Sequence, residues 1–202
     1  MIKLVSNFLV LATLAVFMFI SSPRAEANPS MRDITLATAG LLGWAATHPD
    51  ATSIDNGANI FSIGAFDRVD RIKQTLDVEY QHRWGHYLLW RFKPFAGAGV
   101  TGRRSLYGFG GLELGLHLTP HLVIAPSEAL ALYFHGGGKR LGSPLDFRSG
   151  IDVLWVFKDG ASIGFSYHHI SHWFLFGPSN PGTEILNLTV SIPIPDSGQS
   201  IK

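Results

Sequence analysis

Hydrophobic and polar residues alternate in eight segments between residues 58 and 194. Side chains of a β-strand point to opposite faces in turn, so such alternation predicts strands with one apolar face and one polar or small face. In the last segment, Leu186, Leu188 and Val190 share one face, and Asn187 and Thr189 share the other. The chain is therefore predicted to be all-β, with strands at 59–66, 75–82, 86–101, 107–118, 122–134, 146–157, 162–173 and 184–192.

The connections between these segments alternate in length. Tight turns are expected at 83–85, 119–121 and 158–160, whereas longer or more charged connections fall at 67–73, 102–106, 135–145 and 174–180. This pattern is typical of an antiparallel transmembrane β-barrel of the bacterial outer membrane, with periplasmic turns and extracellular loops. A soluble barrel with its apolar face inward has the same alternation, but the pattern of connections favours the eight-stranded membrane barrel.

The membrane interpretation also predicts the contents of the barrel. The apolar faces would contact lipid, and the polar faces would fill the interior. Charged side chains of both signs lie on these polar faces, so we expect them to pair inside the barrel: Asp77, Glu79, Glu113, Arg148 and Asp152.

The two ends of the chain differ from its centre. Lys3, an apolar run at 8–20 that is short for a membrane span, and the small-residue site Ala25-Glu26-Ala27 predict a cleaved signal peptide over residues 1–27. The alternative is an N-terminal membrane anchor. Residues 28–57 form an N-terminal segment with no readable pattern, and residues 195–202 form a polar tail. The barrel domain is therefore predicted to be 58–194.

Composition narrows the function classes. The chain has 16 Lys and Arg against 15 Asp and Glu, and this near balance predicts no nucleic-acid partner. It has no cysteine, which suits a closed barrel whose hydrogen-bonded wall supplies rigidity. An exported domain without that wall would often need disulfides.

The last two predicted strands carry candidate chemistry. His169 and Ser171 share the apolar face of 162–173 with Phe165, and Glu184 lies on the apolar face of the next strand. Serine as nucleophile, histidine as general base and glutamate as the group that orients the histidine make up a hydrolase triad. The Cα atoms of residues two apart on a strand are about 6.5–7 Å apart, which is within reach of a Ser–His hydrogen bond. Asn180 is the best side-chain candidate for an oxyanion hole.

This triad would lie at the outer rim of the barrel. Polar groups are tolerated near the membrane interface, and the ester bonds of an outer-leaflet lipid lie at the same depth. The alternative is that an interfacial histidine, a strand serine and a rim carboxylate have no joint role. His168 and His172 face the interior by parity, where they suit a polar network, so no metal site is predicted.

The paired motifs of the last hairpin have a known counterpart. His169-Ile170-Ser171, followed by Asn180-Pro181-Gly182-Thr183-Glu184, resembles the PagL family of lipid A 3-O-deacylases of Gram-negative outer membranes. Looser similarity occurs at 62–67, at 125–127 with Tyr133, and at 141–149, so the resemblance covers about 59–194. His172 stands where the family commonly has asparagine, and the chain ends without the aromatic residue usual in outer-membrane barrels.

The resemblance implies an eight-stranded barrel that removes the ester-linked 3-hydroxyacyl chain of lipid A without a metal or cofactor. Ser171 would be the nucleophile, His169 the base, Glu184 the orienting acid and Asn180 a contributor to the oxyanion hole. The implied partners are lipid A or lipopolysaccharide, the outer membrane and a second copy of the chain, because family members can form homodimers.

Basic residues of the predicted extracellular loops fit such a substrate. They could bind the phosphates of lipid A, although each also suits a solvated loop: Arg103, Arg104, Lys139 and Arg140, with Arg68 and Arg71 nearby. The sequence therefore predicts an outer-membrane serine esterase that acts on lipid A. The alternatives are a non-catalytic structural or adhesive barrel of the same fold, and a secreted soluble barrel that binds an apolar ligand.

Overall fold

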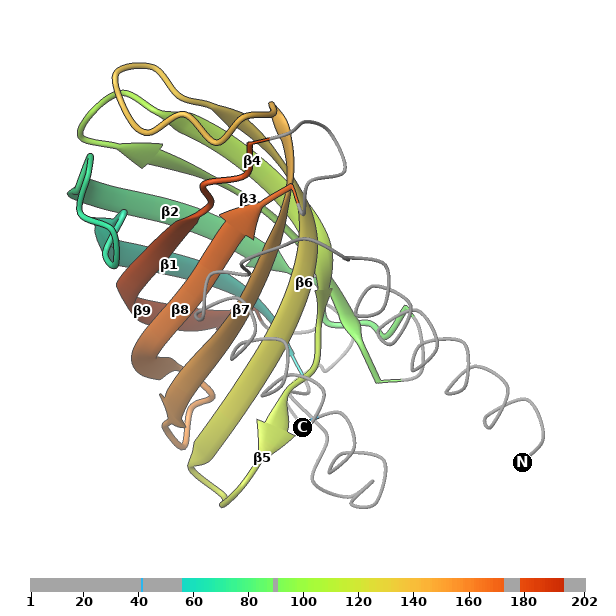
Figure 1. The fold of residues 1–202 in the computed structure, drawn as a ribbon. Coiled ribbons are helices and arrows are strands. Elements are labelled where there is room, and N and C mark those ends of the chain that lie inside the picture. The colour runs from blue at the N-terminus through green and yellow to red at the C-terminus, as the bar shows by residue number, and fades with distance from the viewer. Residues whose placement is uncertain (1–40, 42–55, 89–90, 173–178, 195–202) are drawn as a thin grey trace.

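The computed structural model describes residues 41, 56–88, 91–172 and 179–194. Its strands are β1 (Gly57–Phe66), β2 (Thr75–Arg83), β3 (Lys93–Thr101), β4 (Leu106–Glu113), β5 (Leu116–His117), β6 (Leu122–Phe134), β7 (Leu145–Val156), β8 (Ser162–Ser171) and β9 (Thr183–Ile194). They pair in the order β4-β3-β2-β1-β9-β8-β7-β6-β5, and a further β4–β6 pairing closes the sheet into a barrel (Figure 1). The paired strands are antiparallel.

The short strand β5 continues β4 as one strand of the barrel wall. Glu113 pairs with Ser127 and Leu116 pairs with Ile124, so both parts follow one register along β6. The interruption lies opposite Pro126, which has no N–H to donate to the ladder. Leu114 N still donates to Pro126 O at 3.0 Å. The barrel is therefore eight-stranded, as predicted, and the predicted strand 107–118 is broken at one point.

One predicted boundary is wrong. The strand expected at 86–101 begins only at Lys93, so the connection after β2 is longer than the turn expected at 83–85. Because β2 ends at Arg83, which pairs with Phe95, the residues before Lys93 have no partner on that strand. Leu88 N instead donates to Phe92 O at 3.0 Å within the connection.

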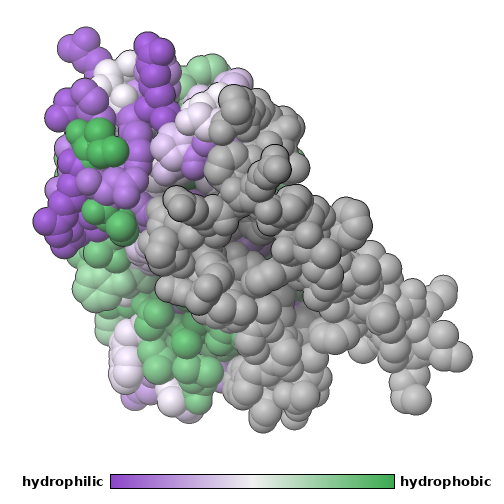
Figure 2. Space-filling view, in the orientation of Figure 1, coloured by the Kyte–Doolittle hydropathy of each residue, from purple (hydrophilic) through white to green (hydrophobic). Residues whose placement is uncertain are grey.

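The outer surface of the barrel is apolar. Large hydrophobic side chains on alternate positions point outward from the wall, among them Leu130 at 55%, Phe134 at 61% and Phe165 at 62% exposure. In Figure 2 hydrophilic residues gather at the end that carries the longer loops, and hydrophobic residues cover the wall below them. The prediction of an outward apolar face is confirmed, and the barrel with its apolar face inward is not what forms. Among the described residues, no helix combines the length and hydropathy that a membrane crossing requires.

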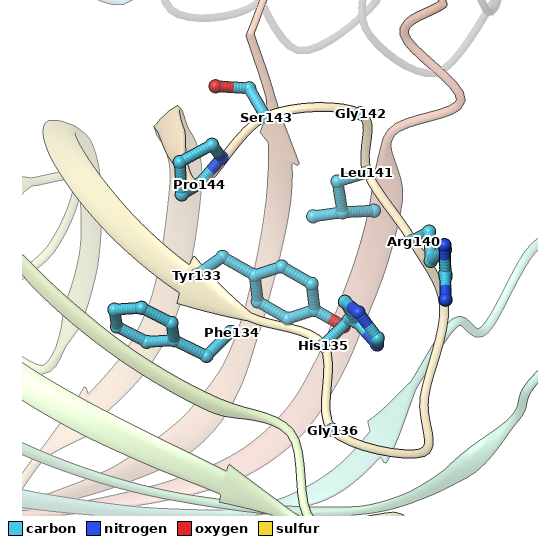
Figure 3. Close-up of a pocket in the computed structure, with 9 residues that line it drawn as sticks. All are labelled: Tyr133, Phe134, His135, Gly136, Arg140, Leu141, Gly142, Ser143 and Pro144. Carbon is cyan, nitrogen blue, oxygen red and sulfur yellow. The ribbon is translucent and has the colours of Figure 1, made fainter.

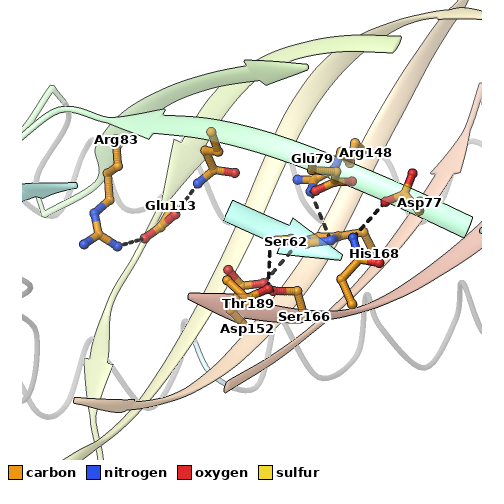
Figure 4. Close-up of polar contacts among 12 residues, drawn as sticks. Ser62, Asp77, Glu79, Arg83, Glu113, Arg148, Asp152, Ser166, His168 and Thr189 are labelled. Atoms are coloured by element: carbon orange, nitrogen blue, oxygen red, sulfur yellow. Dashed lines mark hydrogen bonds and ion pairs between the residues drawn. The ribbon is translucent and has the colours of Figure 1, made fainter. Parts of the chain in front are cut away.

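The interior is filled by paired charges (Figure 4). Arg148 Nη2 lies 2.7 Å from Glu79 Oε2, and Arg83 Nη1 lies 2.6 Å from Glu113 Oε1. Tyr107 Oη donates to Asp77 Oδ1 at 2.6 Å, and His168 Nε2 lies 3.1 Å from Asp152 Oδ1. Of the residues predicted to pair inside the barrel, Arg148 with Glu79 and Glu113 with Arg83 form ion pairs. Asp152 faces His168, and Asp77 accepts hydrogen bonds from the neutral groups of Tyr107 and Asn187.

The predicted terminal segments fall mainly beyond the described part of the chain. Residues 1–27 and 195–202 lie outside it, as do residues 28–57 apart from Leu41, Asn56 and Gly57. Leu41 packs with Phe92 against Leu114 and Leu116. At least one residue of the N-terminal segment therefore contacts the barrel near the interruption between β4 and β5.

Candidate active site

His169 and Glu184 face each other across neighbouring strands. They are directly paired in the β8–β9 register, and both stand on the outward side of the wall. His169 Nδ1 lies 3.3 Å from Glu184 Oε1, close enough for an ion pair but without the alignment of a good hydrogen bond. The two residues are 2% and 0% exposed. A carboxylate at Nδ1 favours the tautomer that leaves Nε2 as the proton acceptor.

Ser171 ends β8, two residues after His169 and on the same outward face. Its side chain is buried. Within the described part of the chain, neither Ser171 Oγ nor His169 Nε2 has a hydrogen-bond partner. Buried polar atoms without partners are costly, and catalytic hydrogen bonds in ligand-free enzymes are often long or unformed. The structure thus brings the three predicted residues to one patch and leaves the Ser–His bond unmade.

His172, the residue after Ser171, forms hydrogen bonds to residues at the far end of the β8–β9 connection. His172 N donates to Asn180 Oδ1 at 3.0 Å, and His172 Nε2 donates to Ser179 O at 2.8 Å. Because the amide oxygen of Asn180 accepts from the backbone, the group that Asn180 has left to offer elsewhere is its NH₂ donor. His172, which stands where the resembling family commonly has asparagine, therefore links Ser171 on β8 to residues 179 and 180 just before β9.

Two glycines allow the loops to pack closely beside the site. Gly182 has φ +58°, and a Cβ there would lie 2.8 Å from His169 Cε1. Gly142, on the connection between β6 and β7, has φ +95°; a Cβ there would collide with Ser179 O and lie 2.9 Å from His172 Nε2. Both positions require the left-handed region and leave no space for a side chain. The β6–β7 connection is therefore in contact with the last loop.

Two outward polar residues were missed in the sequence. Glu128 pairs with Ser149, and Ser149 pairs with His169, so both continue the His169–Glu184 row across β7 and β6. Ser149 Oγ donates to Glu128 Oε2 at 2.8 Å. The available signal was a break in alternation, since Glu128 shares the apolar face of Leu130 and Leu132.

The predicted phosphate-binding residues divide into two kinds. Arg103, Arg104 and Arg140 are exposed in the longer connections. Lys139 is buried, and its Nζ lies 2.9 Å from Asp67 Oδ1 and 2.6 Å from Asp70 Oδ2. Burial opposes the charged form, but the bonds and charges of Asp70 and Asp67 raise the pKa of Lys139 above its usual value. Its charge is satisfied within the protein, so it holds two loops together.

Arg140 also lines an open pocket at this end of the barrel. The pocket lies between the end of β6 and the start of β7, and Figure 3 shows the residues that surround it. His135 and Arg140 give it a basic edge, while Tyr133, Leu141 and Pro144 give it an apolar wall. Since Gly142 is part of the same lining and contacts the last loop, the pocket adjoins the candidate site.

The closed barrel, its apolar outer wall and its charged interior define an outer-membrane β-barrel, here with a serine, a histidine and a glutamate gathered on the outside. The family model "Lipid A 3-O-deacylase (PagL)" matches residues 71–193. That match spans more than half of the chain, and the chain belongs to the PagL lipid A 3-O-deacylase family.

A solved structure of the family agrees with this fold. A structure described as "Crystal structure of the outer membrane enzyme PagL" is similar with a TM-score of 0.55 and 20% sequence identity, over 68% of this chain and 99% of that one. A structure described as "De novo design of transmembrane beta-barrels" has a TM-score of 0.48 and 10% identity, over 69% of this chain and 97% of that one. No curated protein matches the sequence.

Proposed function

We propose that this protein is an outer-membrane serine esterase that hydrolyses the 3-O-linked hydroxyacyl chain of lipid A. One observation carries the proposal. In this member of a lipid A 3-O-deacylase family, the His169–Glu184 pair shares the outward face of the wall with the buried hydroxyl of Ser171, which has no hydrogen-bond partner among the described residues. The patch faces outward near the loop end of the barrel, at the depth where lipid ester bonds meet the membrane interface.

Each residue has a defined step. Ser171 Oγ attacks the ester carbonyl carbon while His169 Nε2 takes the hydroxyl proton. The tetrahedral intermediate collapses, and the sugar oxygen leaves with that proton as an alcohol. Water then attacks the acyl-enzyme with His169 again as base, which releases the fatty acid and restores Ser171. Glu184 keeps the imidazole in the required tautomer and stabilises its charged form.

Asn180 is proposed to stabilise the oxyanion. Its Oδ1 is held by the backbone N–H of His172 at 3.0 Å, which supports the use of its NH₂ group as a donor. A donor held in place before reaction stabilises developing charge more effectively than one that must reorient. Ser171 is 0% exposed, so an ester reaches it only when the residues that cover it move.

The exposed loop arginines are proposed to bind the phosphates of lipid A. Reversing two charges, Arg103→Glu with Arg104→Glu, should weaken binding of lipopolysaccharide at least about tenfold, because charge-assisted contacts contribute roughly 1.5–3 kcal/mol each. Titration of lipopolysaccharide into purified protein in detergent measures this. Lys158→Glu at the opposite end of the barrel is the matched control and should bind as wild type. Equal affinity of all three proteins would show that these arginines are ordinary solvated charges.

The second candidate is a non-catalytic structural or adhesive barrel. The unformed bond between Ser171 and His169 and the full burial of Ser171 favour it. A non-catalytic barrel would keep the same wall and interior, so product chemistry has to separate the two candidates.

The deciding experiment is mass spectrometry of lipid A incubated with wild-type protein, with Ser171→Ala, and with Ser162→Ala as a control on the same strand. We expect wild type and Ser162→Ala to remove one 3-hydroxyacyl chain, and Ser171→Ala to be at least about a thousandfold slower. Equal loss with Ser171→Ala would exclude Ser171 as nucleophile. No loss with any folded variant, on lipid A that carries the 3-O-linked chain, would favour the non-catalytic barrel.

A further inference from the structure

A carboxylate stands on the apolar outer wall beside the candidate active site. Glu128 is exposed on the outward face of β6, in line with Leu130 and Leu132. A charged group on the lipid-facing wall destabilises a barrel by an amount that depends on its depth, although less for an acid than for a base. Neither the triad nor the interior network uses Glu128, so its position calls for a ligand or a structural partner.

Ser149 is the structural partner of Glu128, and it uses part of the hydrogen-bonding capacity of the Glu128 carboxylate. Ser149, which is 5% exposed, donates its hydroxyl to Glu128 Oε2 at 2.8 Å. An ionised carboxylate has about four lone-pair sites and cannot donate. The bond from Ser149 fixes the orientation of the carboxylate and leaves acceptor sites directed to the membrane side of the wall.

The strand register places these acceptors close to the proposed chemistry. Glu128, Ser149, His169 and Glu184 are successive partners across β6, β7, β8 and β9. Neighbouring strands are about 4.8 Å apart, so the backbones of Glu128 and His169 are separated by roughly 10 Å. The Glu128 side chain spans part of this separation. A lipid bound with its ester at Ser171 would place the hydroxyl or amide groups nearest to that ester between Ser171 and the Glu128 carboxylate.

We propose that Glu128 is a specificity-determining residue that accepts a hydrogen bond from a donor on the glycolipid, next to the ester that is cleaved. The donor is a hydroxyl or an amide N–H, carried either by the acyl chain or by the sugar. Ser149 is the positioning residue that orients the carboxylate. This inference rests on the proposed esterase function and assigns it a selectivity: esters that carry the donor react faster than matched esters that lack it.

The test compares kcat/KM for three esters in one detergent: a glycolipid with a hydroxylated acyl chain, the same glycolipid with that hydroxyl removed, and an ester of the hydroxylated chain with a simple alcohol. We expect wild type to prefer a donor-bearing ester at least about tenfold, since an unpaired acceptor in the site disfavours the analogue. Glu128→Leu should bring that preference close to one, and Glu128→Gln should reduce it severalfold. Asp159→Asn, which neutralises a carboxylate at the opposite end of the barrel, should keep it.

The pattern of ratios identifies the source of the donor. Loss of preference between the two glycolipids in Glu128→Leu would assign the donor to the acyl chain, and loss between the glycolipid and the simple ester would assign it to the sugar. Unchanged ratios in Glu128→Leu, which has no acceptor at this position, with hydrolysis still dependent on Ser171, would overturn this inference and leave the esterase intact. No hydrolysis by wild type would remove both proposals together.

Discussion

Replacing Glu184 by glutamine should slow the release of acyl chains from lipid A by about a hundredfold to ten-thousandfold. Glu184 is 0% exposed, and its Oε1 lies 3.3 Å from His169 Nδ1. A glutamine can donate from its NH₂ group to Nδ1, which favours the histidine tautomer with its proton on Nε2. In that tautomer Nε2 cannot accept the proton of Ser171. Loss of the carboxylate in the Ser-His-Asp triad has an effect near the upper end of this range.

The measurement is kcat on lipid A in detergent, with circular dichroism and gel migration before and after heating as checks on folding. Glu184→Asp, which keeps the charge on a shorter side chain, should retain more activity than Glu184→Gln. A Glu184→Gln rate within about threefold of wild type would show that Glu184 is a rim carboxylate with no catalytic part.

Replacing Arg148 by methionine should lower the free energy of unfolding by about 3–5 kcal/mol, because one partner of a buried ion pair would lose its counter-charge. Arg148 is 1% exposed, its Nη2 lies 2.7 Å from Glu79 Oε2, and its guanidinium lies 4.0 Å from the ring centroid of Phe109. The variant leaves Glu79 without this cation in the part of the interior that also holds Asp77 (Figure 4). Tyr107 Oη donates to both carboxylates.

Urea unfolding in detergent micelles or lipid vesicles, followed by tryptophan fluorescence, gives the comparison. The double variant Arg148→Met with Glu79→Gln removes the unpaired charge as well, so it should recover a large part of the lost stability. Equal stability of Arg148→Met and wild type would mean that water or a neighbouring side chain compensates Glu79. A double variant less stable than Arg148→Met would contradict the ion-pair explanation.

Two adjacent histidines of β8 belong to different parts of the barrel, one to the interior network and one to the outward candidate site. His168 points inward, where its Nε2 lies 3.1 Å from Asp152 Oδ1 and its Nδ1 lies 3.0 Å from Arg148 Nη2. His169 points outward to Glu184. The interior network therefore fixes the strand that carries the proposed base, and a change at Arg148 should be checked for activity as well as for stability.

Features that depend on the two-residue period of a strand could be predicted from the sequence alone. Side chains alternate every two residues whatever the neighbouring strands are, so the strands, the apolar face and the common face of His169, Ser171 and Glu184 could all be read from one segment at a time. The charged interior followed once the alternation of short turns and longer loops favoured a membrane barrel, because the face opposite the lipid-facing one then lines the interior. Strand bounds near Pro94 and Pro126 were read less well, because pairing with β2 and β6 decides them.

Contacts across strands and between loops could not be predicted without the folded structure. The row from Glu128 through Ser149 and His169 to Glu184 depends on the register of three strand pairs, and a shift of one residue would turn any member to the other face. Lys139 could be read as a free loop cation until the fold brought Asp67 and Asp70 to its Nζ from another loop. Contacts between residues distant in sequence are set by pairing and loop closure, and the local pattern of hydrophobic and polar residues carries no record of them.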